Sequence, residues 1–221
     1  MSARVFGRGL AVSPHERVAD FARVQVRAGL LGTEALHAEV RVAVVAELPD
    51  DEPADATQTL VAQAAADLFA EQQDWERPTD YEWLQAAFGA LEEQGVVVLQ
   101  AVEDHWDADA ALRRLTAAGR PPEGALWFTA PDVWHAVDHG ILELNVWHGD
   151  TANVAPGDPL LDLVITTLAS HGLAGHFDEG RVEVAARWRK PLPAHGRDSP
   201  ATAAPVTDAP MKAAPVTNVE T

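Results

Sequence analysis

Residues 79–99 read TDYEWLQAAFGALEEQGVVVL, and a change of hydrophobic period inside this stretch decides the fold class. Thr79 and Glu82 have the spacing of a capping box, which predicts the start of a helix. The apolar residues that repeat at helical spacing after it are Leu84, Ala87, Phe88 and Leu91. The run from Val96 to Leu99 is continuous and rich in β-branched residues, as expected for a buried strand. The chain therefore combines helices with a sheet.

The alternation of helices and strands continues on the C-terminal side of this stretch. The expected strands are Val96–Leu99, Ala125–Phe128, Ile141–Trp147, Leu173–Phe177 and Val182–Trp188. The expected helices between them begin near Asp107, Thr129 and Asp158 and end near Gly119, Asp138 and Gly172. The order βαβαβαββ favours a mixed sheet backed by helices on at least one face.

The first 73 residues predict a helical layer that precedes the sheet. Residues 13–16 form a capping box for a first helix, Thr33 is a candidate cap for a second, and a third begins near Ala56. Three short helices bury too little apolar surface to be stable alone, so we expect this layer to pack on the sheet domain or across a dimer. The residues expected to supply most of that contact lie on the third helix: Val61, Leu68 and Phe69.

The predicted fold class is α+β, with an N-terminal helical layer packed on a mixed sheet domain and a disordered C-terminal tail. The expected boundaries are 1–73 for the helical region, 74–190 for the sheet domain and 191–221 for the tail. The tail is rich in Ala, Pro, Thr and Val, and its segment Ala-Ala-Pro-Val-Thr at 203–207 recurs at 213–217. Such a composition buries too little apolar surface to offset the entropy of ordering.

Composition excludes several classes of function. The 221 residues include no cysteine, which excludes disulfide scaffolds, thiolate metal sites and cysteine nucleophiles. With 34 acidic and 16 basic side chains the formal net charge is −18, which argues against nucleic-acid and anionic-membrane partners. The segment 121–180 contains neither lysine nor arginine and could attract a basic protein partner. Because no signal sequence or membrane span is recognisable, we expect a cytoplasmic protein.

A set of residues spread over the sheet domain matches the pattern of a known family. They are Trp75, Thr79-Asp80, Gly95 to Gln100, Ala136-Val137, Gly140 and Trp188-Arg189. Over about Trp75 to Arg189 the chain resembles an uncharacterised bacterial family, mainly actinobacterial, of unknown function. The resemblance implies no established activity. The chain departs from it at residues 101–106, where members carry an Asn-Ala-Gly-Tyr-type loop, and at Thr129, where members place a histidine. A site formed by that loop and that histidine would be missing here.

Histidines and carboxylates gather where the sequence predicts a helix followed by a strand. The candidate metal ligands are His135, His139, His148 and Asp150, with Asp138 nearby. His135 and His139 are four residues apart, so one helical turn could direct both imidazoles at one ion such as zinc. The glutamate of an H-E-x-x-H motif is missing, because Ala136 follows His135. The alternative is a pair of exposed histidines at a helix end, where the dipole favours them.

A second group, Glu103, Asp104 and His105, directly follows the first expected strand. Loops at the carboxyl ends of strands often carry function in α/β sheets. Two carboxylates beside a histidine could perform acid–base catalysis, with Trp106 excluding water. The alternative is a surface loop in which Asp104 or Asp107 caps the next helix.

Seven tryptophans are the remaining unusual feature. Trp83, Trp106 and Trp134 are candidate anchors of a protein interface, where tryptophan is enriched, and core packing is the alternative. Because the sequence contains no complete catalytic motif, the leading hypothesis is a non-enzymatic protein-binding or regulatory domain without a cofactor. Its partner would be another protein, basic in character, or a second copy of the chain. The competing hypothesis is a small metal-dependent hydrolase that uses the His/Asp cluster.

Overall fold

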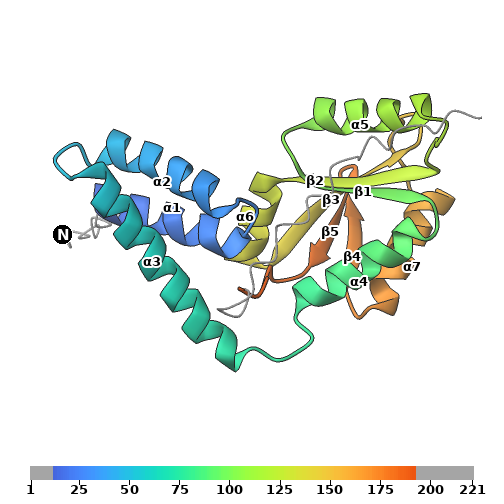
Figure 1. The fold of residues 1–221 in the computed structure, drawn as a ribbon. Helices are drawn as coiled ribbons and strands as arrows, with labels where there is room; N and C mark the ends of the chain where they lie inside the picture. The colour runs from blue at the N-terminus through green and yellow to red at the C-terminus, as the bar shows by residue number, and fades with distance from the viewer. Residues whose placement is uncertain (1–11, 193–221) are drawn as a thin grey trace, which may run out of the picture.

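A five-stranded mixed sheet forms one half of the molecule (Figure 1). The computed structural model describes residues 12–192. The strands are β1 (Val96–Val102), β2 (Gly124–Thr129), β3 (Ile141–His148), β4 (Gly175–Asp178) and β5 (Arg181–Ala185), arranged in the order β1-β2-β3-β5-β4. β1 is parallel to β2, and the other neighbouring strands are antiparallel. The expected α+β class, the order βαβαβαββ and the closing hairpin are confirmed.

Among the described residues, four α-helices precede the first strand and three lie between strands. The helices are α1 (Pro14–Ala28), α2 (Thr33–Glu47), α3 (Pro53–Glu71), α4 (Asp80–Glu92), α5 (His105–Ala117), α6 (Ala130–His139) and α7 (Pro159–Ser170), with a short 3-10 helix at Gln72–Asp74. The capping boxes at Ser13 and Thr79 form as expected, because each side chain accepts the backbone N–H of the glutamate three residues on.

Three helix starts differ from the sequence expectation. α3 begins at Pro53, three residues before the expected start near Ala56. Gly32 caps α2, so Thr33 is the first helical residue instead of the cap. Asp104 caps α5, where Asp107 was the expected start, because the Asp104 carboxylate accepts the N–H groups of Trp106 and Asp107 at 2.8 and 3.1 Å. The aspartate nearer the strand therefore ends the loop, and α5 begins earlier than predicted.

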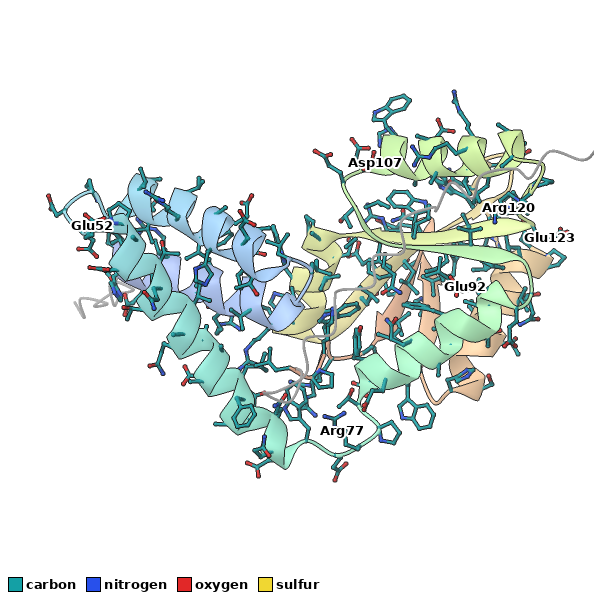
Figure 2. The ribbon with its side chains drawn as sticks, in the orientation of Figure 1. Glu52, Arg77, Glu92, Asp107, Arg120 and Glu123 are labelled. Atoms are coloured by element: carbon teal, nitrogen blue, oxygen red, sulfur yellow. The ribbon has the colours of Figure 1, made fainter. Side chains whose placement is uncertain are left out.

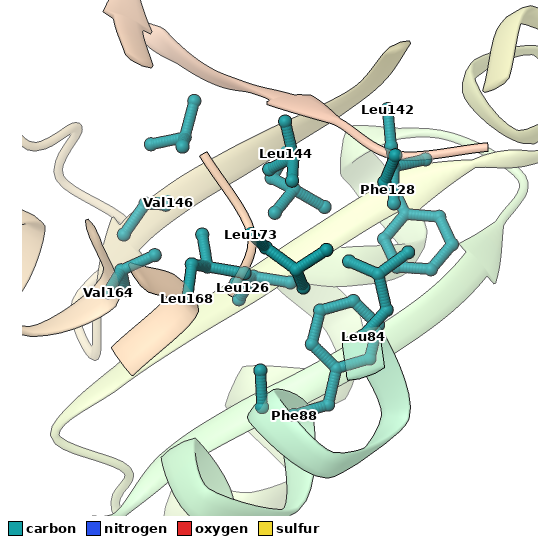
Figure 3. Close-up of a cluster of buried hydrophobic side chains, with 14 of the residues drawn as sticks. Leu84, Phe88, Leu126, Phe128, Leu142, Leu144, Val146, Val164, Leu168 and Leu173 are labelled. Carbon is teal, nitrogen blue, oxygen red and sulfur yellow. The ribbon is translucent and has the colours of Figure 1, made fainter. Parts of the chain in front are cut away.

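The main core lies on the face of the sheet that α4 and α7 cover (Figure 3). Leu142, Leu144 and Val146 alternate along β3 and are buried against these helices. All four inward residues expected on α4 are buried. Figure 1 shows α5 on the opposite side of the sheet, where it packs against β1. The sheet is thus covered on both faces at its β1 end.

β1 is an edge strand, which changes the expected environment of residues 96–99. Val96 is buried, but residues 97–99 are only half-buried. The expectation of a fully buried strand is therefore wrong for these three residues, because a continuous apolar run does not reveal whether a strand has neighbours on both sides.

Helices α1, α2 and α3 enclose a second group of buried residues, which we call the helical core. Its fully buried members are Val18, Ala22, Val26, Val40, Val44, Val61, Ala64 and Leu68. The expectation that Val61, Leu68 and Phe69 contact the sheet domain is wrong. Val61 and Leu68 belong to the helical core, and Phe69 is 41% exposed. The helical unit instead reaches the sheet domain through α1, which packs against α6 and places Ala28 in the main core.

The segment 186–192, which we call the C-terminal strap, fastens the helical unit to the sheet domain. Trp188 Nε1–H donates to the carbonyl oxygen of Ala28 at 2.9 Å, and the Lys190 ammonium donates to that of Gly29 at 2.7 Å. Leu192 packs against the helical core. The predicted packing of the helical layer on the sheet domain is therefore achieved by α1 and the strap.

The expected disordered tail lies outside the described residues except for Pro191 and Leu192, which belong to the strap. Ordered contacts thus extend past the expected boundary at residue 190. Within residues 12–192, no helix combines the length and the hydropathy that crossing a membrane requires.

Candidate functional site

His135 and His139 lie side by side on α6, as their spacing predicts. Their ring centroids are 4.8 Å apart in an edge-on arrangement. The nearest carboxylate is Glu143 on β3, whose Oε1 lies 3.8 Å from Nδ1 of His135 and which also forms an ion pair with Arg181. Asp138 instead pairs with Arg23 of α1 at 2.7 Å. Glu143 was not among the sequence candidates, because only the packing of α6 beside β3 brings it to the histidines.

His148 and Asp150 lie away from this histidine pair. His148 ends β3, whereas α6 leads into the other end of that strand, and an eight-residue strand spans roughly 25 Å. Nε2 of His148 is 2.7 Å from Oδ2 of Asp158, and Asp150 accepts the N–H of Ala152 at 3.1 Å. In the described part of the chain, no three histidines or carboxylates gather into a group that could hold a metal ion. The four proposed ligands are therefore not brought together.

Asp158 has two roles at the start of α7. Its carboxylate accepts the N–H of Leu160 at 2.9 Å, which caps the helix. This backbone hydrogen bond lowers the pKa of Asp158, and the His148 imidazole beside it lowers the pKa further. The pair thus ties the end of β3 to the start of α7.

Glu103, Asp104 and His105 lie on the outer surface at the start of α5, where Figure 2 shows the neighbouring Asp107. The Asp104 carboxylate is occupied by the helix cap, and Asp107 accepts the N–H of Glu103 at 3.4 Å. His105 packs against Trp106, with ring centroids 4.5 Å apart. All the groups of this segment are exposed, so it does not enclose a substrate.

The three candidate anchor tryptophans have different environments. Trp106 is 67% exposed. Trp83 is 39% exposed and lines a shallow hollow of about 470 Å³ at the start of α4, beside Arg77 and Glu82. Trp134 is half-buried against the main core, and its Nε1–H has no acceptor among the described residues. Trp83 and Trp106 therefore remain accessible to a partner, whereas Trp134 mainly packs.

A groove of about 710 Å³ lies between α2 and the first turns of α3. It is lined by Glu34, His37, Ala38, Arg41, Val42, Val45, Ala54, Thr57 and Gln58. Thr57 is only 3% exposed, yet its hydroxyl has no hydrogen-bond partner among residues 12–192. The hydroxyl oxygen is inaccessible to a water-sized group, so a ligand in the groove would meet the other lining atoms and not this oxygen.

The groove is bordered by a row of exposed apolar residues, which we call the α2 seam. Its members are Leu31, Ala35, Ala38, Val42 and Val45, and all of them are exposed. Val42 and Val45 are 67% and 55% exposed. The seam lies opposite the stripe of Val40 and Val44, which faces the helical core. Alternating steps of three and four residues are the signal of such a second apolar face.

These features define the class of protein: an α+β domain in which a three-helix unit with an open apolar face is fastened to a five-stranded mixed sheet. The family model DUF6891, a domain of unknown function, matches residues 12–192, and the chain belongs to this family. The match confirms the resemblance found over the sheet domain and extends it to α1, α2 and α3. No curated protein and no solved structure matches the chain.

Proposed function

We propose that this chain is a non-enzymatic protein-binding domain and that the α2 seam and its groove form the binding surface. One observation carries the proposal: α2 is apolar on two opposite faces, and only one of them is covered within the described residues. A helix that is apolar on two faces is normally covered on both. Exposed contiguous apolar surface beside charged residues is typical of protein interaction sites.

The attachment of the helical unit to the sheet domain also supports a binding role. The strap and α1 hold the helices against the sheet domain through Trp188, Lys190 and Arg23. A surface held in place before binding loses less conformational entropy on association. The acidity of segment 121–180 is a separate feature that repels polyanions and favours basic proteins.

The test compares the proteins retained by three full-length baits: wild type, Val42→Glu and Ala66→Glu. Val42→Glu introduces a charge on the seam, whereas Ala66 is exposed on α3 and does not line the groove. We expect wild type and Ala66→Glu to retain the same proteins, including untagged copies of the chain itself, and Val42→Glu to lose them. Equal retention by all three baits would contradict a binding role for the seam.

The metal-dependent hydrolase is the second candidate, favoured by the adjacent imidazoles of His135 and His139 and the nearby Glu143. It predicts a bound transition metal in protein purified without a histidine tag. Less than about a tenth of an equivalent would speak against a tightly held metal. The binding function is the better supported, because the described ligands beyond this trio are engaged elsewhere.

A further inference from the structure

We infer that the α2 seam binds a second copy of this chain, with the two α2 helices antiparallel about a two-fold axis near His37 and Ala38. The inference rests on the proposed binding function and names the partner of that surface. It is drawn from three features of this surface: the spacing of the seam, the charges that flank it and the groove beside it.

The spacing of the seam is that of a helix that pairs with another helix. On α2 the steps from Ala35 through Ala38 and Val42 to Val45 are three, four and three residues, which keeps one apolar row facing a partner along the helix, and Leu31 lies just before the helix begins. A globular core needs no such regularity, and the inner face of α2 uses the ordinary stripe of Leu36, Val40, Ala43 and Val44. The small residues Ala35 and Ala38 allow two backbones to approach closely near the two-fold axis.

The charges beside the seam favour the antiparallel orientation. Glu34 and Arg41 lie on the same flank of the seam, one heptad apart, and neither forms an ion pair among residues 12–192. In an antiparallel pair, Glu34 of each copy meets Arg41 of the other, because the axis near residues 37 and 38 exchanges these two positions. In a parallel pair, Glu34 would instead face Glu39 of the second copy, and like charges would repel. The antiparallel dimer therefore contains two Glu34–Arg41 pairs, one on each side of the two-fold axis.

The groove supplies the third argument. Thr57 and Gln58 of α3 lie across the groove from Ala38 and Arg41 of α2. A second α2 laid along the seam would cover this groove with its own side chains, among them His37 and Arg41. The α2–α3 hairpin would then form half of a four-helix arrangement, which is the usual way for two helical hairpins to cover their apolar faces.

The first test is the mass of the full-length protein in solution, measured by light scattering and sedimentation at up to about 100 μM. We expect twice the 23.7 kDa of one chain for wild type and for Ala66→Glu, and a single chain for Val42→Glu. Circular dichroism of Val42→Glu should be unchanged, because Val42 is exposed. A wild-type mass of 23.7 kDa throughout, or a Val42→Glu variant that remains dimeric, would overturn the inference.

Charge exchange tests the antiparallel orientation directly. Each of the single variants Glu34→Arg and Arg41→Glu places like charges together in its own homodimer, so each should dissociate at least about tenfold more readily than wild type. An equimolar mixture of the two variants should form a mixed dimer, because each interhelical pair then carries opposite charges. Absence of the mixed dimer, with both variants weakened, would exclude the antiparallel arrangement.

Salt separates this partner from a basic one. Raising the salt concentration from about 50 to about 500 mM screens both the repulsion between two chains of net charge −18 and the attraction of the Glu34–Arg41 pairs, so dimerisation should change little. Binding of a basic partner would weaken over the same range. If the chain is monomeric but loses another protein upon Val42→Glu, the second-copy inference fails while the binding function stands. If nothing depends on Val42, both fail.

Discussion

At the scale of single residues, Trp188 joins the sheet domain to the helical unit through one indole. Its ring lies edge-on to Tyr81 and Phe128, with centroids 4.9 and 5.9 Å away, and its Nε1–H reaches the carbonyl oxygen of Ala28. The residue is 4% exposed, so this hydrogen bond is shielded from water. The C-terminal end of α1 therefore depends on a side chain that lies far away in the sequence.

Trp188→Phe keeps most of the ring packing but leaves the Ala28 carbonyl oxygen without its donor. We expect a loss of roughly 1–3 kcal/mol in the free energy of unfolding, measured by urea denaturation. Trp83→Phe is the matched control, because Trp83 is exposed, and its effect should stay within about 0.5 kcal/mol. Equal losses for both variants would contradict the anchoring role of Trp188.

Glu82 contributes to a pH dependence of stability at the start of α4. It accepts the N–H of Thr79 at 2.7 Å, and this bond, reinforced by Arg77, lowers the pKa of Glu82. A carboxyl whose folded pKa is below its unfolded value of roughly 4.3 stabilises the fold above that pH, and the contribution disappears as pH falls through the folded pKa.

Glu82→Gln should therefore lower the melting temperature at pH 7, with a cost of up to about 1 kcal/mol for a charge at a helix N-terminus. The difference from wild type should shrink as the pH falls from about 5 toward about 3, as followed by circular dichroism. Glu76→Gln is the control, because Glu76 is exposed in the preceding loop and makes no hydrogen bond in the described part of the chain. A constant difference at all pH values would mean that packing, and not the charge, is responsible.

At the scale of elements, the strap shows that a short segment without regular structure can hold two units together. The Lys190 ammonium is partly buried between the Gly29 carbonyl and the face of Tyr81, whose ring centroid is 5.9 Å away. This burial lowers the pKa of Lys190. Gly29 has a φ of +58°, and a Cβ there would lie 3.2 Å from the Lys190 side chain. The turn after α1 thus favours glycine for two independent reasons.

Two truncations test the strap. A chain ending at Leu192 should melt close to the full-length temperature, because the contacts of the strap are all retained. A chain ending at Arg189 loses the Lys190 hydrogen bond and the packing of Leu192, together about 2 kcal/mol or a few degrees in melting temperature. If the two chains melt alike, the strap does not fasten the helical unit. If the chain ending at Leu192 melts well below the full-length protein, residues beyond 192 contribute to its stability.

At the scale of the whole molecule, the helical core and the main core meet at the end of α1. Ala28 is fully buried and Leu30 is partly buried in the main core, although both belong to the N-terminal region. The family match covers both cores, because it spans residues 12–192. A division of the chain near residue 73 therefore places Ala28 and Leu30 in one segment and the rest of the main core in the other.

The fragment 74–197 tests whether the sheet domain is independent. We expect it to melt well below the full-length protein or to aggregate, because removing α1 uncovers Trp188 and the α6 surface. Differential scanning calorimetry of this fragment and of 1–197 makes the comparison with the same C-terminal end. A monomeric fragment with a cooperative transition near that of 1–197 would mean that the two cores are separate domains.

The local features of the fold follow from the sequence alone. The capping boxes at Ser13 and Thr79 and the inward stripe of α4 were predictable, because each signal lies within a few neighbouring residues. The same holds for the order of strands and helices, since the switch from helical to strand periodicity is visible along the chain.

Contacts between distant segments were decided only by the tertiary structure. Glu143 beside His135, β1 at the sheet edge and Val61 in the helical core each depend on how elements pack, which no local pattern specifies. The α2 seam is an intermediate case. Its spacing is visible in the sequence, but an apolar row on a helix can face the core of its own chain or a partner equally well. Only the packing of the opposite face of α2 against α1 and α3 leaves the seam exposed, because a helix can turn just one side toward a given core.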